Sequence, residues 1–157
     1  METTRHYTAT MYIVCDDQTA LHPHPKLSIW LPPGGHIARD ELPHEAALRE
    51  AREETGLEVD LLHSPNASSS ATARALPHPE TILLEDITVV DQRPSHQHID
   101  FIYFGSVDSQ EIAPTGDDEV DASEWEWVDR AQLTVDSRFP ADVAELGTRA
   151  IDAASAD

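Results

Sequence analysis

The sequence predicts an α/β fold in which a β-sheet is sandwiched by helices. Strand-like runs dominate the chain, one helical segment lies near its middle, and a second lies at its C-terminal end. This order of elements is typical of a sheet that buries its faces against helices. The 157 residues match the size of one ordinary domain and show no internal repeat, so we expect a single domain over residues 1–157.

Six runs have the alternation, or the β-branched and aromatic content, of strands. They are Arg5–Val14, Leu27–Leu31, Glu58–Leu62, Thr81–Val90, His98–Val107 and Glu124–Val128. In the last run we expect Trp125 and Trp127 to share one face and to serve as core residues rather than as nucleobase stackers. Between the strands the sequence predicts loops at Asp16–Pro25, His63–Pro79 and Asp108–Asp121, and Pro32 to Gly35 is expected to have no regular structure.

Two segments have the signals of helices. Pro43–Thr55 begins with a proline, which suits a first helical turn, and is followed by Gly56, which suits the position just past a helix end. Its small residues fall on one side, which can lie close against a sheet: Ala47, Ala51 and Thr55. Phe139–Ala154 places apolar residues at helical spacing: Val143, Leu146, Ala150 and Ile151.

The charge is strongly acidic, with a formal net value of -20. Such a surface repels nucleic-acid polymers and anionic membranes, and it suits a salt-rich cytoplasm. We find no apolar run long enough to span a membrane and no secretory signal at the N-terminus, so a cytoplasmic protein is expected. The single cysteine, Cys15, follows an apolar run and is interpreted as a small core residue.

Three glutamates of the central helix carry the strongest chemical signal. Glu50, Glu53 and Glu54 are spaced i, i+3 and i+4, which puts them on one helix face, where like charges repel unless a cation lies between them. Carboxylate oxygens of this kind suit Mg²⁺. Arg49 can pair with Glu41 from the preceding loop, which would hold that loop against the helix. An acidic helix face exposed to water is the alternative interpretation of the glutamates alone.

The wider segment resembles the Nudix box, a pattern of fixed glycine, glutamate and arginine positions found in MutT-like hydrolases. It spans residues 35–57, and its specified positions are Gly35, Glu41, Arg49, Glu50, Ala51, Glu53, Glu54, Gly56 and Leu57. Every fixed position matches, although Ala51 is small for the aliphatic position. The preceding Trp30–Gly34 also resembles the usual lead-in.

The resemblance implies a Nudix fold, an α/β/α sandwich with a mixed sheet and a loop–helix–loop catalytic motif. It implies Mg²⁺ or Mn²⁺ held by Glu50, Glu53 and Glu54, with the backbone at Gly34 close to the metal. Gly35, Glu41 and Gly56 would have structural roles, and Arg49 would belong to the catalytic group. The reaction would be water attack on a diphosphate of a nucleoside diphosphate linked to a group X, giving a nucleoside monophosphate and phosphorylated X.

Two candidates remain for the general base. Glu50 matches the box position that often binds the metal-bound water or takes its proton. Some members of the family use a residue from a later loop, and here the acidic loop offers Glu119. For the substrate pocket, His98 and Asp100 at a strand start are candidates. A zinc site at His96 and His98 is disfavoured, because no third ligand is visible in the sequence.

Other functions on the same fold stay open. An isopentenyl diphosphate isomerase would use a catalytic cysteine, for which Cys15 is the sole candidate. A non-catalytic nucleotide-binding module tends to lose box glutamates, whereas this box is complete. The substrate is expected to be a small phosphorylated molecule. Because proteins that resemble this one commonly form dimers, a homodimer is also predicted.

Overall fold

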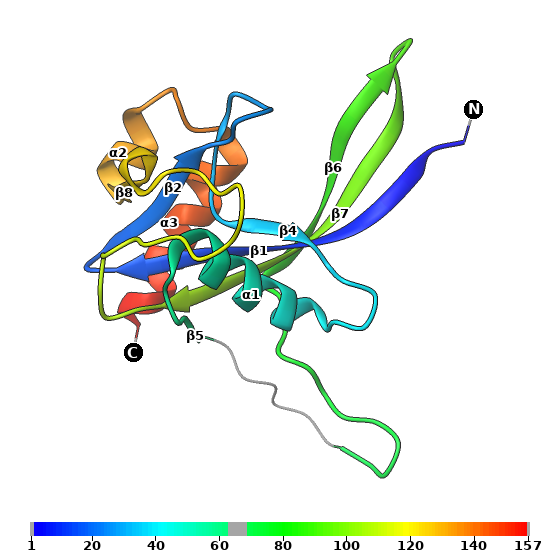
Figure 1. Cartoon of the computed structure of the whole chain (residues 1–157), viewed down its shortest axis with the longest axis horizontal. Helices are drawn as coiled ribbons and strands as arrows, with labels where there is room; N and C mark the ends of the chain where they lie inside the picture. The colour runs from blue at the N-terminus through cyan, green and yellow to red at the C-terminus, as the bar shows by residue number, and fades with distance from the viewer. Residues whose placement is uncertain (1, 63–68, 157) are drawn as a thin grey trace.

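A mixed β-sheet forms the centre of the computed structural model, which describes residues 2–62 and 69–156 (Figure 1). Its order is β3 (Trp30–Leu31), β2 (Gln18–Pro23), β1 (Thr4–Cys15), β7 (Arg93–Ser106) and β5 (Asp60–Leu61). Three strands pair off this path: β4 (Gly34–His36) with β1, β6 (Thr81–Val90) with β7, and β8 (Glu126–Asp129) with β2. β1 and β7 are parallel, and the other pairs are antiparallel, so the predicted mixed sheet is confirmed.

Two helices cover opposite faces of this sheet, as the predicted sandwich requires. On β1, Met11 and Ile13 pack with the small residues of α1 (Pro43–Thr55). The alternate residues Tyr12 and Val14 pack with α3 (Ala141–Ser155). Successive side chains of a strand point to opposite faces, so β1 is hydrophobic on both sides. A shorter helix, α2 (Arg130–Val135), and a 3-10 turn, Ala122–Glu124, complete the fold.

The helix α1 begins and ends where the sequence predicts. Pro43 occupies its first turn, and the Glu45 carboxylate accepts a hydrogen bond from the Leu42 N–H at 2.9 Å. Gly56 ends the helix in the left-handed conformation, with φ of 75°. The predicted small-residue face is fully buried, so the helix lies close against β1.

Several predicted boundaries were wrong. Asp16–Pro25 is not a loop throughout, because Gln18–Pro23 forms β2 between β1 and β8. Gly34–His36 forms β4 despite the preceding prolines, since its backbone pairs with β1. Leu27–Leu31 and Glu58–Leu62 contain only two-residue strands, and Phe139–Ala154 is helical from Ala141. The predicted strand His98–Val107 begins earlier, at Arg93, and Glu124–Val128 is a strand only from Glu126.

The strands β6 and β7 extend beyond the helices as a hairpin (Figure 1). The predicted loop His63–Pro79 lies partly outside the described residues, and its described part, 69–79, has no helix or strand. Cys15 is buried, as predicted. Within the described chain, none of the helices has the length and hydropathy needed to span a bilayer.

Candidate active site

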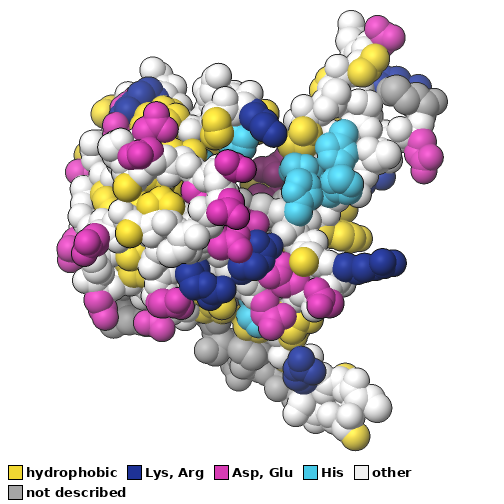
Figure 2. Space-filling model, viewed as in Figure 1, with side chains coloured by type: hydrophobic (Ala, Val, Ile, Leu, Met, Phe, Trp, Pro, Cys, Tyr) yellow, Lys and Arg dark blue, Asp and Glu magenta, His cyan; other side chains and the backbone are white. Residues whose placement is uncertain are grey.

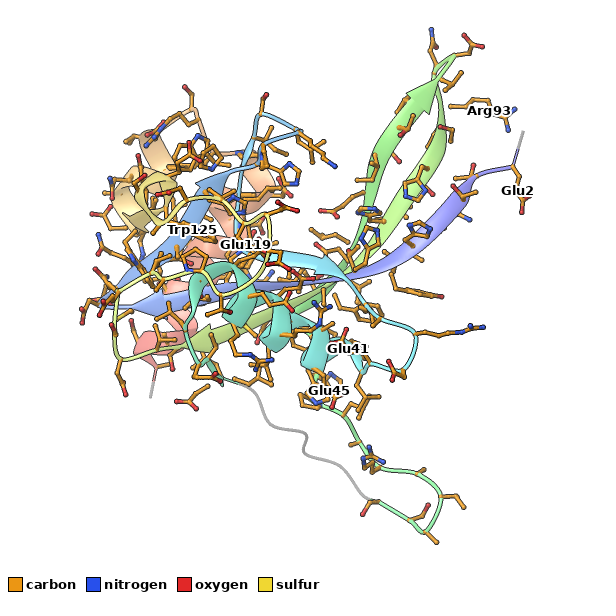
Figure 3. The ribbon with its side chains drawn as sticks, viewed as in Figure 1. Glu2, Glu41, Glu45, Arg93, Glu119 and Trp125 are labelled. Atoms are coloured by element: carbon orange, nitrogen blue, oxygen red, sulfur yellow. The ribbon has the colours of Figure 1, made fainter. Side chains whose placement is uncertain are left out.

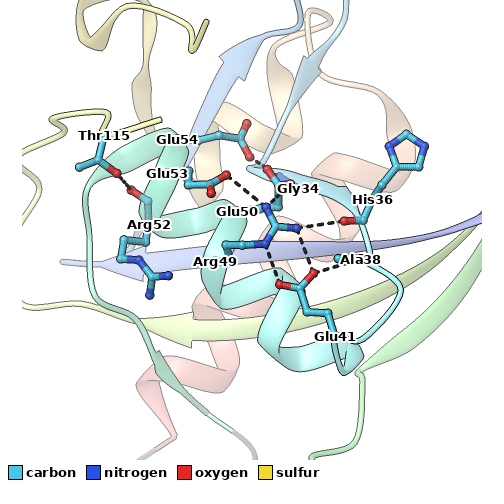
Figure 4. Close-up of polar contacts among 10 residues, drawn as sticks. All are labelled: Gly34, His36, Ala38, Glu41, Arg49, Glu50, Arg52, Glu53, Glu54 and Thr115. Carbon is cyan, nitrogen blue, oxygen red and sulfur yellow. Dashed lines mark hydrogen bonds and ion pairs between the residues drawn. The ribbon is translucent and has the colours of Figure 1, made fainter. Parts of the chain in front are cut away.

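Arg49 connects the glutamates of α1 to the loop before the helix (Figure 4). Its Nε donates to the Glu41 carboxylate at 2.6 Å, and its Nη2 donates to the other oxygen of Glu41 at 3.0 Å. The same guanidinium donates to Glu50 at 2.9 Å and to Glu53 at 3.1 Å. The structure thus contains the ion pair between Arg49 and Glu41 that the sequence suggests, and a two-point pair of this kind fixes the loop geometry.

Glu54 connects the helix to the glycine strand β4. The Gly34 N–H donates to the Glu54 carboxylate at 2.9 Å. Gly35 lies directly under the neighbouring glutamate, because a Cβ at this position would be 2.4 Å from Glu50 Oε1. Only a glycine allows the backbone and the carboxylate to approach so closely.

His22 is a site residue that the sequence did not reveal. It was expected in an exposed loop, but it lies on β2 with 3% of its surface exposed, and its Nε2 is 3.7 Å from Glu54 Oε1. Its ring packs against Trp125 with centroids 4.5 Å apart. Trp125 is buried, as predicted, and it supports this side of the site. Burial lowers the pKa of His22 to about 4, so its ring is neutral at pH 7.

Glu119 reaches the same region from the acidic loop (Figure 3). This loop is anchored to the end of α1: the N–H groups of Thr115 and Gly116 donate to the Glu53 carbonyl at 2.9 and 3.0 Å, and that of Ala113 donates to the Thr55 carbonyl at 2.8 Å. Carbonyls at a helix end lack partners within the helix, and this loop supplies them. Glu119 is therefore held beside Glu50 and Glu53, whose charges, after burial, raise its pKa.

The cluster holds more negative charge than Arg49 can neutralise. Burial first, and then the charge of Glu50, raises the pKa of Glu54 to about 9. Burial also raises the pKa of Glu50, although Arg49 opposes that shift. Carboxylates that are half-buried, close together and short of positive partners fit a divalent cation, and hard oxygen ligands are those that Mg²⁺ and Mn²⁺ prefer.

A cavity of about 890 Å³ opens beside these carboxylates. Glu50, Glu54, Glu119 and Gly34 line it, whereas Glu53 lies outside its lining and points to Arg49. The wall formed by the long strands contributes Asp100, which accepts hydrogen bonds from the hydroxyls of Thr8 and Thr10 at 3.0 and 2.8 Å.

His98 also lines the cavity, so both predicted pocket residues lie on one wall. Glu85 faces the same space from β6, and burial, with Asp100 adding to the effect, raises its pKa to about 8. Sequence reasoning missed Glu85, because only the β6–β7 register places it opposite His98.

A mixed sheet between helices, with a carboxylate-bearing loop–helix–loop at a large cavity, defines a class of phosphate-processing hydrolases. The family model of the NUDIX domain matches residues 4–148, and the chain therefore belongs to the Nudix family. It is a Nudix hydrolase, an enzyme of a family that cleaves pyrophosphate bonds in small phosphorylated substrates and generally uses divalent metals.

Solved structures agree with this membership. A hydrolase of the NUDIX family from Clostridium perfringens is 32% identical, with a TM-score of 0.79 over 95% of this chain and 97% of that one. A MutT protein from Methanosarcina mazei Go1 is 16% identical, with a TM-score of 0.63 over 100% and 99% of the two chains, and shows the shared fold. No curated protein matches the sequence significantly.

Proposed function

We propose that the chain hydrolyses the diphosphate of a nucleoside diphosphate linked to a group X, in a reaction that depends on Mg²⁺ or Mn²⁺. The observation that carries this proposal is the position of Glu50 and Glu54 at a cavity of about 890 Å³. A cavity of that size suits a nucleotide-sized ligand. The acidic cavity also needs a cation before it can accept an anionic phosphate.

Glu50 and Glu54 would hold the cation from the cavity side, with Gly34 at the backbone beside them. Glu53 would join them by turning its carboxylate away from Arg49. When bound, the cation neutralises phosphate charge and lowers the pKa of a bound water. Arg49 is not expected to bind the substrate directly, because its N–H donors are already occupied by Glu41, Glu50 and Glu53. Its role is to fix the directions of the glutamates, so a replacement would disturb metal binding before chemistry.

The general base is proposed to be Glu119, with Glu50 as the alternative. A base must reach the attacking water, and Glu119 lines the cavity on a loop anchored to α1. Burial and the neighbouring carboxylates raise the pKa of Glu119, which makes it a stronger base than a free glutamate. Burial raises the pKa of Glu50 as well, but its carboxylate already accepts a hydrogen bond from Arg49, which holds it in place and suits a ligand better than a base.

The wall at Asp100 and His98 is proposed to bind the nucleoside or X portion. Asp100 is an acceptor, and Glu85, whose pKa of about 8 leaves it protonated at pH 7, can donate or accept; both suit hydroxyl or amino groups. The neutral ring of His98 can accept or donate one hydrogen bond. Among the described residues, β6 and β7 contribute no lysine or arginine to the lining, and the one lining lysine, Lys26, lies in the connection between β2 and β3. The phosphates are therefore expected near the box and the neutral part of the substrate near the wall.

The isomerase alternative receives no support. Cys15 lies at the end of β1, is 6% exposed, and is not among the described residues that line the cavity. The complete set of carboxylates at that cavity also favours turnover over a module that only binds a nucleotide.

The decisive experiment is a product assay over a panel of nucleoside diphosphate derivatives, nucleoside triphosphates and dinucleoside polyphosphates. Release of a nucleoside monophosphate from a diphosphate-X substrate, with Mg²⁺ or Mn²⁺ and not with excess chelator, is the expected result. Full turnover in chelator would contradict the metal requirement, and turnover of triphosphates alone would contradict the substrate class. Tight binding of a nucleotide without any cleavage would support the binding-module alternative.

A homodimer also stays a prediction. Its support is the hairpin of β6 and β7, on which Ile82, Leu84 and Val89 are 53%, 60% and 56% exposed. Large exposed apolar side chains in one element are typical of an interaction surface. The molecular mass in solution, measured by light scattering, tests this expectation.

A further inference from the structure

Four histidine side chains line the same cavity as the box carboxylates. Figure 2 shows histidine side chains grouped beside a hollow at the base of the β6–β7 hairpin, and the cavity lining includes His6, His36, His96 and His98. The ring centroids of His6 and His96 are 4.6 Å apart, and those of His96 and His98 are 5.2 Å apart. Of this group, only His98 is used in the function proposed above, where it contacts the neutral part of the substrate; the clustering of the rings is not explained by that role.

The sheet register explains why three of these rings converge. His96 and His98 are two residues apart on β7, so both point to the same face. In the parallel pairing, His6 on β1 lies opposite His98. One ligand nitrogen from each of the three rings can be chosen so that all lie within 4.8 Å of one another. The third ligand that the sequence lacked is therefore supplied by a residue 90 positions earlier in the chain.

A neighbouring hydroxyl orients one of the rings. Thr4 Oγ1 lies 2.8 Å from His96 Nδ1 and can donate its own proton to the Ser95 carbonyl at 3.3 Å. In that arrangement His96 Nδ1 carries the hydrogen and Nε2 keeps a free lone pair. Metal-binding histidines are commonly oriented in this way by a partner on the other ring nitrogen.

We propose that His6, His96 and His98 form a binding site for a transition-metal ion of the Zn²⁺ class, separate from the box carboxylates. Three imidazoles suit such an ion and are poor ligands for Mg²⁺, which prefers oxygen. Tetrahedral Zn²⁺ with Zn–N bonds of about 2.0–2.1 Å requires nitrogens about 3.3 Å apart. The three rings must therefore turn toward one another when the ion binds.

The environment agrees with this assignment. His6 is exposed and His96 and His98 are partly buried, which leaves a path for the ion to enter. Three protein ligands leave a fourth position for water or a substrate oxygen, as in open zinc sites.

The test is a zinc titration of metal-depleted protein without a histidine tag, in millimolar Mg²⁺ that occupies the carboxylates. Competition with a chromogenic zinc indicator should give one Zn²⁺ per chain. His98→Asn and His6→Gln should each weaken that binding by more than about tenfold. The matched control is His78→Asn, an exposed histidine on the 69–79 segment, which should bind Zn²⁺ as the parent does.

Co²⁺ substitution provides a readout independent of activity. A four-coordinate site with nitrogen ligands gives strong visible absorption, which six-coordinate oxygen sites lack. The absorption should persist in Glu54→Gln and disappear in His98→Asn. Equal Zn²⁺ binding by the parent and both histidine variants would overturn the proposal. So would loss of binding in Glu54→Gln with retention in His98→Asn, because the ion would then lie at the box. Neither result bears on whether the enzyme cleaves a diphosphate.

Discussion

Glu54 combines a structural hydrogen bond with a charge that the fold alone cannot accommodate. Its carboxylate accepts from the Gly34 N–H, and burial raises its pKa to about 9. A glutamine at this position keeps an oxygen that can accept from Gly34, but it loses the anionic ligand. We expect Glu54→Gln to fold with an unchanged or higher Tm without metal, while kcat falls by about a hundredfold or more. Thermal melts and Mg²⁺-dependent hydrolysis measure the two effects. A variant that retains full activity would exclude Glu54 as a ligand.

Glu119 can be tested against a neighbour on the same loop. General base catalysis contributes about 10²–10⁴-fold, so Glu119→Gln should lower kcat by that order with little change in KM. Asp117→Asn is the control, because Asp117 is exposed on the same loop and does not line the cavity. Steady-state kinetics distinguish the two variants. A loss of less than a few fold would return the role to Glu50, whose own glutamine variant should then show the larger loss.

At the scale of single elements, the end of α1 at Gly56 contributes both to the stability of the fold and to the position of the loop that carries Glu119. Gly56 has φ of 75°, and a Cβ there would be 2.1 Å from the Ala113 carbonyl oxygen. Gly56→Ala should therefore cost at least about 1–2 kcal/mol of unfolding free energy, and it should also displace the loop that carries Glu119. The unfolding free energy measured by urea denaturation and the kcat should both fall. Glu58→Ala, at an exposed position two residues later, should change neither. A stable Gly56→Ala variant with parental activity would contradict the anchoring role.

The elements that the sequence predicted best are those with local signals. Pro43 and Gly56 marked both ends of α1, and the predicted strand Thr81–Val90 has the same bounds as β6. β2 and β4 were missed because their prolines and glycines suppress local strand propensity, and only pairing with β1 makes them strands. The helix α2 was missed because it has only 6 residues, too few to show a helical period, and its main local signal is the Asp129 cap.

The same distinction holds within the site. The box spacing was sufficient to place Glu50, Glu53 and Glu54 on one helix face, because helical periodicity is a local property. His22, Glu85 and the proximity of His6 to His98 depend on strand register, which joins distant parts of the chain. Such contacts cannot be read from spacing.

At the scale of the whole molecule, the pH dependence of stability has a defined sign. The pKa of Glu85 is raised from 4.5 to about 8 and that of Glu54 to about 9. About one pH unit above 6.5, the histidines of the unfolded chain are largely neutral, and the folded chain retains protons that the unfolded chain has released. Stability of the metal-free protein should therefore fall between about pH 7.5 and 9. Urea denaturation at several pH values measures this slope, and Glu85→Gln should make it shallower. A stability that rises across this window would contradict the prediction.

Net charge gives a second whole-molecule prediction. At -20, repulsion within the folded chain is substantial, and salt screens it over about 10 Å at 0.1 M. We expect Tm to rise from low salt to molar salt. Melting curves in NaCl test this, with a comparison in a neutral osmolyte to separate screening from solvent exclusion. An unchanged Tm would count against a salt-adapted surface.

The parallel pairing of β1 with β7 also affects how the chain must be made. Thr8 meets Asp100 across a separation of 92 residues, and β1 is apolar on both faces. During synthesis at about 5–20 residues per second, β1 emerges roughly 5–20 s before its partner strand exists. Its turn with β2 can form early, but the cavity wall cannot. Folding is therefore expected to be slow for the size of the chain, and the nascent N-terminal strand must stay soluble until β7 leaves the ribosome.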